Sequence, residues 1–333
     1  MIRLGIIYGG ISTEHDISVM SAKSIIENLD KGKYEIHEIY INEYGKWFQN
    51  SNGEKEEINN LVWYLKDLDV VFPVLHGLGG EDGTIQGMFE MLKLPYVGCG
   101  VFASSIGMDK VYTKAIFEKA GIEQVPYMYI KKNENGYVII NEKFEEEDFK
   151  IEKISNKIKF PMFVKPSNSG SSIGVKKAMN NSELKMAIEH AAEYDNKILV
   201  EQGINAREIE CAILEDKELT ASTVGEIISA EGFYSFDAKY NIPESKTIIP
   251  AEIEEKQIEE IRKIAIKAFK AIDGKGLARV DFFIEKETNK IYINEINTMP
   301  GFTKISMYPK LFEAVGITYS ELLDKLIENA MQM

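Results

Sequence analysis

The first hundred residues contain short strand-like apolar runs that alternate with helical segments. Leu4–Tyr8, Tyr34–Ile41 and Val70–Leu75 have the composition of buried strands, and apolar residues recur at helical spacing after the first of them. The glycine-containing turn Gly9–Asp16 lies between that strand and that helix, as at the opening of an α/β unit. The pattern therefore predicts a small open parallel sheet, with functional loops beyond the carboxyl ends of its strands.

After Met108 the pattern is less regular, and its clearest elements lie toward the C-terminal end. Apolar positions from Ile258 to Ile272 have the spacing of a long amphipathic helix. Two β-rich runs follow, Leu277–Glu285 and Ile291–Asn297, and a polar, turn-prone segment separates them. This arrangement predicts an antiparallel hairpin.

The predicted hairpin carries side chains suited to metal and phosphate chemistry. Strand side chains alternate between faces, so Arg279 and Asp281 share one face of the first strand. Glu295 and Asn297 likewise share one face of the second. If the two faces coincide, oxygen ligands suited to Mg²⁺ converge beside a guanidinium. The alternative is an edge hairpin with solvated charges, but the flanking apolar positions indicate an embedded hairpin, where carboxylates without a cation would be costly. A metal site is therefore favoured.

A second candidate is the segment KPSNSGSSIGV, which begins at Lys165 on leaving an apolar strand. A lysine followed by small residues, whose backbone N–H groups can approach a ligand, is typical of a phosphate site, although the segment is not a Walker A loop. Pro166 and the apolar residues after the loop fix both of its ends, which disfavours a flexible surface turn. Gly98–Ala103 matches the dinucleotide pattern GxGxxG/A, but no complete βαβ unit follows, so we interpret it as a tight strand-to-helix turn.

Three further segments leave alternatives open. Glu14 and His76 lie in loops after predicted strands; a lone glutamate is usually solvated and a lone histidine usually structural, so a direct role stays open for both. The remaining histidines lack zinc-site spacing. The strand that ends at Glu201–Ile204 could present backbone groups to an adenine, with Glu208 near a ribose, but an ordinary strand and loop fits equally well.

Residues 230–250 form a long segment without apolar periodicity, and its middle is FYSFDAKY. A loop of this length is usually functional or disordered. Its cluster of aromatic residues disfavours a disordered linker, so we expect a lid that closes over a ligand.

Composition narrows the classes of partner and compartment. The chain has 333 residues, two cysteines, a net charge of −14 and a pI near 5.0. The acidic balance disfavours nucleic acid, although a locally basic cleft can still bind ATP. Two cysteines cannot build a disulfide framework, the N-terminal run lacks the features of a signal peptide, and no apolar run reaches membrane-spanning length. We therefore expect a cytoplasmic protein with no membrane partner.

Several long motifs, in this order, are similar to those of one known family: YGGISTEHDIS, HGLGGEDGTIQG, VKPSNSGSSIGV, FDAKY, and ARVDFF with INEINTMPGFTKISMYP. Over essentially its whole length the chain resembles the D-alanine–D-alanine ligases of the ATP-grasp superfamily. The resemblance implies an N-terminal α/β domain over residues 1–108. It also implies two α+β lobes, residues 109–202 and 203–333, that hold ATP between them, with the lid at about 230–250.

The implied reaction joins two D-alanines through a D-alanyl phosphate, with ATP as the phosphoryl donor, to supply a peptidoglycan precursor. Some relatives use D-lactate or D-serine as the second substrate, so D-alanyl-D-lactate and D-alanyl-D-serine remain alternative products for this chain. The resemblance also implies two Mg²⁺ ions, with Mn²⁺ as a substitute, activation by a monovalent cation and a homodimer. A regulatory module that had lost catalysis would show gaps in the metal triad or at Arg279, and none is missing. A carboxylate kinase without ligation would not need a second-substrate pocket.

The resemblance also implies roles for individual residues. The metal ligands would be Asp281, Glu295 and Asn297. The nucleotide would be bound by Lys110, Lys165, Ser171, Glu201, Gln202, Gly203, Ile204, Glu208, Phe233, Lys239 and Phe283. The amino-acid substrates and the reacting atoms would be contacted by Glu14, His76, Ser171, Tyr240, Arg279, Gly301, Lys304 and Ser306.

Overall fold

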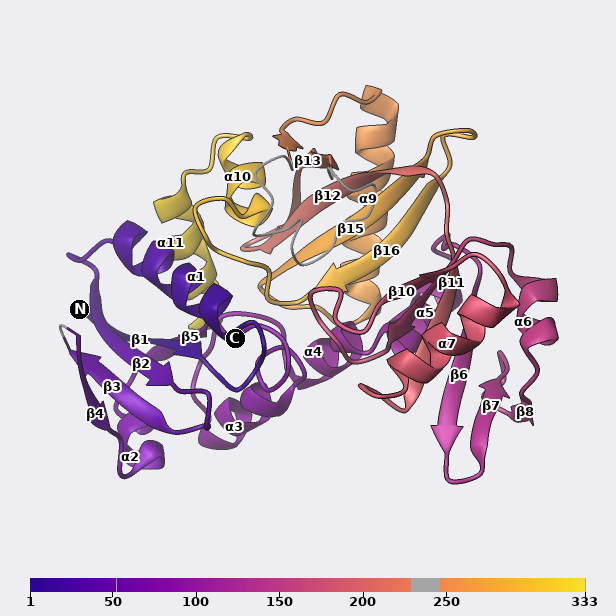
Figure 1. Ribbon diagram of the computed structural model, residues 1–333. Helices are drawn as coiled ribbons and strands as arrows, with labels where there is room; N and C mark the ends of the chain where they lie inside the picture. Colours follow the sequence, from indigo (N-terminus) through magenta and orange to yellow (C-terminus); the bar gives the residue numbers. More distant parts are fainter. Residues whose placement is uncertain (52, 229–245, 333) are drawn as a thin grey trace.

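Three β-sheets organise the chain (Figure 1). The computed structural model describes residues 1–51, 53–228 and 246–332. The mixed α/β and α+β fold class expected from the sequence is confirmed. No helix within these residues is both long and apolar enough to cross a membrane.

The N-terminal sheet has the order β4-β3-β2-β1-β5, with a parallel core. Its strands are β1 (Ile2–Gly9), β2 (Tyr34–Ile41), β3 (Trp47–Ser51), β4 (Glu54–Glu57) and β5 (Val70–Pro73). Strand β1 pairs in parallel with β2 and β5, as predicted, whereas β3 and β4 form an antiparallel edge that the sequence did not predict. The edge strands are half-buried or exposed and lack a buried apolar stripe, and Trp47 of β3 packs against the core.

The helices of this part of the chain join strands of the sheet or follow its last strand. They are α1 (His15–Asn28), α2 (Leu61–Lys66), α3 (Thr84–Leu92) and α4 (Val101–Met108). Gly100 is the N-cap of α4, so the GxGxxG/A match is a turn into a helix, as interpreted from the sequence.

The second sheet is antiparallel, in the order β10-β9-β11-β6-β7-β8. Its strands are β6 (Tyr127–Asn133), β7 (Gly136–Ile140), β8 (Glu146–Asp148), β9 (Met162–Pro166), β10 (Lys176–Ala178) and β11 (Lys197–Gln202). Helices α6 (Ile151–Lys157) and α7 (Asn181–Ala191) share one core with this sheet, and α5 (Lys110–Lys119) packs against Tyr129 and Leu199. The phosphate-type loop predicted from the sequence connects β9 to β10.

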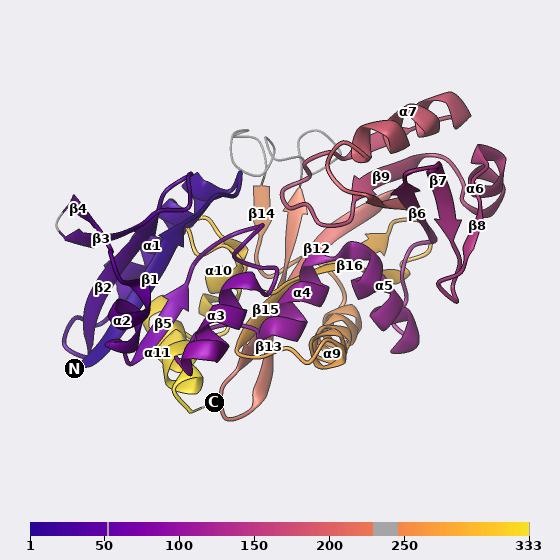
Figure 2. The same cartoon turned by 90° about the horizontal axis from the view of Figure 1, so that it is seen from below.

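The third sheet is also antiparallel, in the order β14-β13-β12-β15-β16. Its strands are β12 (Ala206–Glu215), β13 (Leu219–Ile228), β14 (Lys246–Ile248), β15 (Leu277–Glu285) and β16 (Ile291–Asn297). Helix α9 (Glu255–Ala271) covers one face (Figures 1 and 2). The predicted amphipathic helix and hairpin are both confirmed.

Side chains alternate between the two faces of the sheet along β12, and the two faces differ in character. Ile209, Cys211 and Ile213 point into the core under α9. Glu208 and Glu210, on the opposite face, line a cavity, and farther along the same face the strand packs on the last two helices. One face is therefore structural, and the other carries the polar side chains.

The last two helices, α10 (Met307–Glu313) and α11 (Tyr319–Ala330), pack against the N-terminal sheet. Figure 1 shows α11 beside α1, although they lie at opposite ends of the sequence. In this core Phe72 of β5 packs with Phe302 and Tyr308. The rings of Phe72 and Phe302 are perpendicular, with their centroids 5.4 Å apart. The first and last segments of the chain therefore stabilise one another. The domain boundaries expected at residues 108 and 202 stay predictions.

Candidate active site

One cavity of about 700 Å³ lies among the three sheets. Nearly all of the predicted site residues line it: Glu14, His76, Lys110, Lys165, Ser171, Glu201, Gln202, Gly203, Ile204, Glu208, Arg279, Asp281, Phe283, Glu295, Asn297, Gly301 and Ser306. These residues come from segments up to 292 positions apart in the chain, and folding brings them to a single space.

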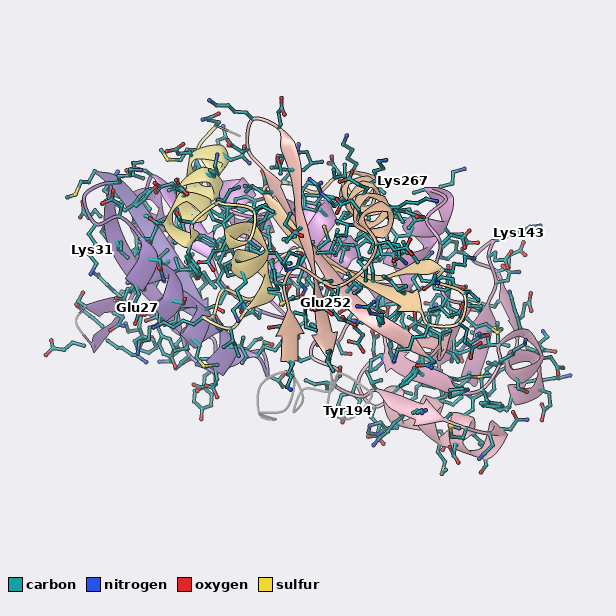
Figure 3. All side chains as sticks on the ribbon, turned by 90° about the horizontal axis from the view of Figure 1, so that it is seen from above. Glu27, Lys31, Lys143, Tyr194, Glu252 and Lys267 are labelled. Carbon is teal, nitrogen blue, oxygen red and sulfur yellow. The ribbon has the colours of Figure 1, made fainter. Side chains whose placement is uncertain are left out.

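The other four predicted residues are Phe233, Lys239, Tyr240 and Lys304. Phe233, Lys239 and Tyr240 lie outside the described residues. Lys304 does not line the cavity. Its ammonium lies 2.9 Å from the carboxylate of Glu27 and its side chain is 76% exposed, so the structure does not bring it to the predicted substrate site. Figure 3 shows Glu27 on the N-terminal part of the molecule, and other labelled charges such as Lys143 and Lys267 lie at the periphery.

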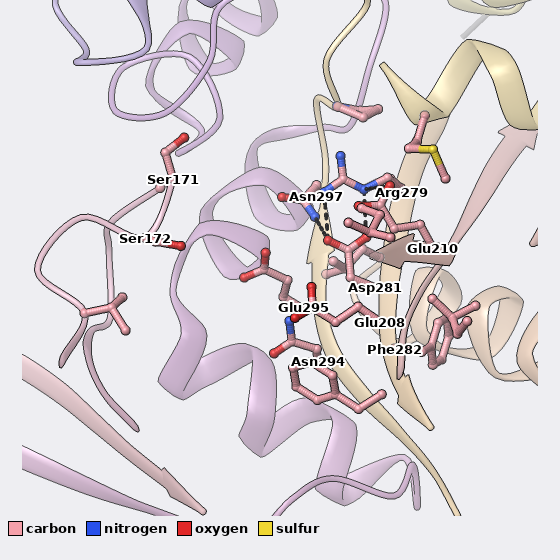
Figure 4. Close-up of a pocket in the computed structure, with 18 of the residues that line it drawn as sticks. Ser171, Ser172, Glu208, Glu210, Arg279, Asp281, Phe282, Asn294, Glu295 and Asn297 are labelled. Atoms are coloured by element: carbon pink, nitrogen blue, oxygen red, sulfur yellow. Dashed lines mark hydrogen bonds and ion pairs between the residues drawn. The ribbon is translucent and has the colours of Figure 1, made fainter. Parts of the chain in front are cut away.

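The metal-type residues meet on β15 and β16, as the sequence predicted. Asp281 is directly opposite Glu295 in the register of the two strands, and Arg279 is opposite Asn297. Asn297 Nδ2 donates to Asp281 Oδ2 at 3.0 Å. The predicted convergence of three oxygen-bearing side chains and a guanidinium on one face is therefore observed (Figure 4).

A β-bulge makes this convergence compatible with the core. The register shifts between Asp281 and Phe282, where Phe282 pairs with Ile293 and leaves Asn294 as the extra residue. Strict alternation would put Glu295 on the same face as Ile293, toward the core. The extra residue lets Ile293 and Ile296 both enter the core under α9 while Glu295 faces the cavity. Bulges beside functional sites commonly redirect a side chain in this way.

Arg279 is the central cation of this face. Its Nε and Nη2 each lie 2.7 Å from an oxygen of Asp281, and Nε lies 3.0 Å from Glu210 Oε2. Burial works against its charge, but the Asp281 and Glu210 carboxylates raise the pKa of Arg279 well above its ordinary value. The guanidinium therefore stays charged throughout the working pH range.

The donor set suits a hard divalent cation. Carboxylate and amide oxygens from Asp281, Glu295 and Asn297 are the ligand types that Mg²⁺ prefers. Within the described residues no three Asp, Glu, His or Cys side chains are arranged as a metal ligand set. Two carboxylates with an amide, and with phosphate oxygens from a ligand, would meet the requirement of Mg²⁺, which usually binds substrate phosphates as well.

A buried charge cluster forms the wall opposite the hairpin. Glu201 forms two ion pairs: its Oε1 lies 2.6 Å from Lys114 Nζ, and its Oε2 lies 2.5 Å from Lys165 Nζ. Burial opposes the charge on Glu201, but the two lysines lower the pKa of its carboxyl to about 2. Glu201 thus holds both lysines, and Lys165, which lines the cavity, is positioned for an anionic ligand.

The segment after Glu201 is fixed as it leaves the sheet. Gln202 N donates to Pro126 O at 2.9 Å, and Gly203 N donates to Pro161 O at 2.7 Å. A Cβ on Gly203 would lie only 2.9 Å from the Phe163 ring, so the glycine lets strand and ring pack closely. This segment offers a cavity wall of fixed backbone, as an adenine site requires.

The loop after Lys165 has an anchored base. The Ser167 hydroxyl donates to Asp109 Oδ1 at 2.6 Å and accepts from Val111 N at 3.0 Å, which ties the loop to the start of α5. Lys110 Nζ donates to Ser169 O at 2.7 Å and lies 3.9 Å from Glu295. Lys110 thus connects the loop to the metal-type hairpin across the cavity.

Glu14 joins this loop to the N-terminal sheet. It is the N-cap residue of α1, is 9% exposed, and accepts a hydrogen bond from the Ser171 hydroxyl. A Cβ on Gly77 or on Gly170 would lie 2.6 Å or 2.5 Å from Glu14 Oε2. A side chain at either position would displace the Glu14 carboxylate from its present place, and the positive φ of 72° at Gly77 also favours glycine there.

His76 joins three segments and carries no charge. Its Nδ1 lies 3.2 Å from Met299 O, so this nitrogen must be the donor. Its Nε2 then accepts from the Ser21 hydroxyl at 3.1 Å, and Ser21 Oγ accepts from Phe302 N at 3.2 Å. Burial lowers the pKa of His76. The histidine therefore positions the segment around Gly301 by neutral hydrogen bonds.

The Ser306 hydroxyl is held beside Gly301. It accepts from Thr303 N at 2.9 Å and shares a hydrogen bond of 2.8 Å with Thr303 Oγ1. A Cβ on Gly301 would lie 2.8 Å from Ser306 Oγ, so glycine is required for this approach. Backbone and hydroxyl groups thus converge at the end of the cavity beyond Arg279.

Three residues of the site were absent from the sequence prediction: Lys114, Glu81 and Glu210. Lys114 lies four residues after Lys110, one helical turn along α5, and this spacing was the available signal. Glu210 lies two residues after Glu208 on β12, so alternation alone places both on the cavity face. Glu81 stands in the HGLGGEDG motif, but nothing in the residue pattern indicates that it lines the cavity in a partly buried position.

Comparisons with known proteins agree with this geometry. The model of the D-ala D-ala ligase C-terminus matches residues 116–328, and that of the D-ala D-ala ligase N-terminus matches residues 3–63 and 60–99. The D-alanine–D-alanine ligase of Acetivibrio thermocellus is 48% identical, over 99% of this chain and 96% of its own length. The corresponding ligase of Caldicellulosiruptor bescii is 46% identical, over 99% and 95%.

Solved structures of similar proteins have the same fold. The VanG D-Ala:D-Ser ligase from Enterococcus faecalis superposes with a TM-score of 0.86 at 33% identity, over 99% of both chains. The D-alanine–D-alanine ligase from Coxiella burnetii superposes with a TM-score of 0.85 at 34% identity, over 99% of this chain and 94% of that one.

The charge cluster predicts the effect of removing Lys114. Lys114→Met leaves the buried Glu201 with one cation, and we expect the free energy of unfolding to fall by about 1–3 kcal/mol, measured by urea denaturation. Lys119→Met, at an exposed position of the same helix, should change it by less than about 0.5 kcal/mol. Equal effects of the two substitutions would contradict the cluster.

Glu81 predicts a pH dependence of stability. Burial, together with the charge of Glu14, raises the pKa of Glu81 from 4.5 to about 8. The folded state therefore holds a proton that the unfolded state releases between these values, so stability falls as pH rises through this window. Glu81→Gln removes the ionisation, and its Tm relative to wild type should increase steadily from pH 5 to 8.

The control for Glu81 is Glu56→Gln, on the exposed strand β4. Its Tm difference from wild type should stay constant over the same range. A constant difference for Glu81→Gln as well would show that this carboxyl does not hold a proton in the folded state.

Proposed function

The chain belongs to the D-alanine–D-alanine ligase family, and from this premise we propose that its cavity joins two D-alanines in a reaction that converts ATP to ADP and phosphate. The observation that carries the proposal is the single cavity, in which a cationic wall, a metal-type hairpin and the Glu14 carboxylate face one another. Each of these three parts matches one need of the reaction: phosphate binding, charge neutralisation and ammonium binding.

The nucleotide lies between the second and third sheets in this proposal. Lys110 and Lys165 neutralise its phosphate oxygens, and Asp281, Glu295 and Asn297 hold two Mg²⁺ ions. When bound, these ions neutralise the charge that develops on the transferred phosphoryl group. The chain's own contribution is to position the phosphates, because phosphoryl transfer needs positioning and electrostatic stabilisation more than covalent help.

The adenine and ribose lie at the end of β11. The backbone of Gln202–Ile204 faces the adenine, and Glu208 receives the ribose hydroxyls, with Phe283 beside it on β15 in the same register. Glu201 has both oxygens near lysines, so we assign it to orienting Lys165 as well as to bordering the adenine pocket. Phe233 and Lys239 keep their proposed nucleotide contacts from the lid, outside the described residues.

The first D-alanine places its ammonium on Glu14. The link from Ser171 to Glu14 supports this position, with Tyr240 as its third member in the lid. His76 lies near the substrate carboxylate and holds the Met299–Phe302 segment. The carboxylate of this first substrate attacks the γ-phosphate of ATP, which gives D-alanyl phosphate and ADP.

The second D-alanine completes the reaction. Ser306 binds its carboxylate, and its amine attacks the carbonyl of D-alanyl phosphate so that phosphate leaves. Arg279 and the Gly301 N–H stabilise the oxyanion of the tetrahedral intermediate, as preorganised donors do in acyl transfer. Lys304 has no part in this proposal, because its ammonium pairs with Glu27 away from the cavity.

The proposal extends to the compartment, to alternative cations and to the oligomeric state. The acidic composition and two buried thiols fit a cytoplasmic enzyme. Mn²⁺ accepts the same oxygen ligands as Mg²⁺ and would serve as a substitute. A homodimer and activation by a monovalent cation follow from family membership alone.

A ligase that uses D-serine or D-lactate as its second substrate is the alternative, and the likeness to the Enterococcus faecalis ligase keeps it in the test. The relatives of higher identity are D-alanine–D-alanine ligases, which favours D-alanine. Met307 borders the Ser306 end of the cavity, where the second side chain would lie.

The deciding experiment measures ADP release with Mg²⁺-ATP and D-alanine, and identifies the product by mass. D-alanine-dependent ADP that matches D-alanyl-D-alanine in amount is expected, with L-alanine as the inactive control. D-serine and D-lactate are offered as second substrates in parallel. A mixed product made in preference to the dipeptide would overturn the proposed specificity, and no ADP at all would overturn the ligase.

The hairpin gives a second test of this function. Glu295→Gln removes a proposed metal ligand and should lower Mg²⁺-supported turnover by about 100-fold or more, with the fold intact by circular dichroism. Glu287→Gln, in the exposed turn of the same hairpin, is the matched control and should keep normal turnover. Near-normal activity of the Glu295 variant would remove this residue from the metal site.

A further inference from the structure

Arg279 has two carboxylate partners from two different strands. Asp281, on its own strand β15, holds it with both oxygens at 2.7 Å. Glu210, on β12, lies 3.0 Å from Arg279 Nε and is 5% exposed. Glu210 and Asp281 are direct neighbours in the register of the two strands, and Figure 4 shows both beside the guanidinium.

Asp281 has competing tasks if the proposed metal site is correct. In this structure both of its oxygens face the Arg279 guanidinium, and Oδ2 also accepts from Asn297. A divalent cation on the same carboxylate would lie close to the guanidinium, and the two positive charges would repel. Metal binding therefore requires Arg279 to loosen its contact with Asp281.

A buried guanidinium cannot be released without another partner. Leaving a buried charge without a counter-charge is costly, and Arg279 lies well inside the cavity with 15% of its side chain exposed. Glu210 is already within contact distance, with Oε2 3.0 Å from Arg279 Nε. Transfer from one carboxylate to the other needs only small side-chain rotations, because the two lie on adjacent strands.

We propose that Glu210 is a positioning residue that takes over Arg279 when Asp281 binds Mg²⁺. The proposal rests on the metal site of the proposed function. Glu210 keeps the guanidinium charged, buried and directed into the cavity, where the oxyanion forms, while Asp281 turns to the metal. It also limits how strongly Arg279 competes with the metal for Asp281.

The test measures the dissociation constant of Mn²⁺ by electron paramagnetic resonance, in the presence of ADP. Glu210→Gln should weaken Mn²⁺ binding about tenfold, because Arg279 then depends on Asp281 alone. Glu226→Gln is the matched control: it removes a buried carboxylate that holds Arg207 in the same sheet and should leave the Mn²⁺ dissociation constant unchanged.

A second substitution separates contact from charge. Glu210→Asp keeps the negative charge but shortens the side chain by one methylene, so it should lose the 3.0 Å contact and bind Mn²⁺ as weakly as Glu210→Gln. Wild-type affinity in Glu210→Asp would show that only the charge matters and would overturn the positioning role.

A double-mutant cycle with Arg279→Lys tests whether Glu210 acts through Arg279. Lysine keeps the positive charge but cannot reproduce the two-pronged contact with Asp281. Glu210→Gln should change Mn²⁺ affinity by less than about twofold in the Arg279→Lys background. An equal effect in both backgrounds would make Glu210 a metal ligand or a direct electrostatic contributor, and would overturn the proposal.

The outcomes distinguish this inference from the function on which it rests. If the wild-type protein binds no Mn²⁺ with ADP, the metal site of the proposed function is wrong. If wild type binds Mn²⁺ and Glu210→Gln binds it equally well, the metal site stands and the role of Glu210 is wrong.

Discussion

The contact between Arg279 and the carboxylates of the third sheet is the interaction on which the site depends. A guanidinium and several acidic side chains share one face of a sheet whose other face is a hydrophobic core. Such a face is stable only while the opposite charges compensate one another, because each alone would be a buried unpaired charge. The charged side chains of the site therefore contact one another before any ligand arrives, and a ligand changes the partners among them.

The rest of the molecule encloses this face. The N-terminal sheet contributes Glu14 and His76, and the second sheet contributes Lys165 and its anchored loop. Hydrogen bonds that cross between sheets fix their relative positions: Ser171 to Glu14, and His76 to Met299. The packing of the last helices against the first sheet closes the arrangement from the other side. Residues that are distant in the chain thus reach one cavity through contacts that are themselves part of the site.

The hairpin and the faces of its side chains could be predicted from the sequence, because both depend on local residue patterns. The hairpin of β15 and β16 appeared with its observed bounds, since two β-rich runs flank a polar turn. Alternation placed Arg279 with Asp281 and Glu295 with Asn297. The bulge at Asn294 was not predicted, although the apolar spacing from Ile293 to Ile296 departs from strict alternation at that point.

Features that depend on partners far away in the sequence were missed. The role of Lys114 follows from its distance to Glu201, which only the folded second sheet determines. The raised pKa of Glu81 follows from burial beside Glu14, 67 positions earlier. The family resemblance assigned Lys304, together with the nearby Ser306, to the second substrate, yet its side chain extends to Glu27 at the surface. Sequence proximity indicates a shared loop, but it does not fix the direction of a long side chain.

The most direct measurement is the thermal stability of Arg279→Met with and without Mg²⁺. If Arg279 is the counter-charge of this face, its removal leaves the negative charges of Glu210, Asp281 and Glu295 without that cation. The Tm in metal-free buffer should then fall. Mg²⁺ should then restore stability and raise the Tm of the variant more than that of wild type. An unchanged Tm on substitution, or an equal rise with Mg²⁺ in both proteins, would contradict the account.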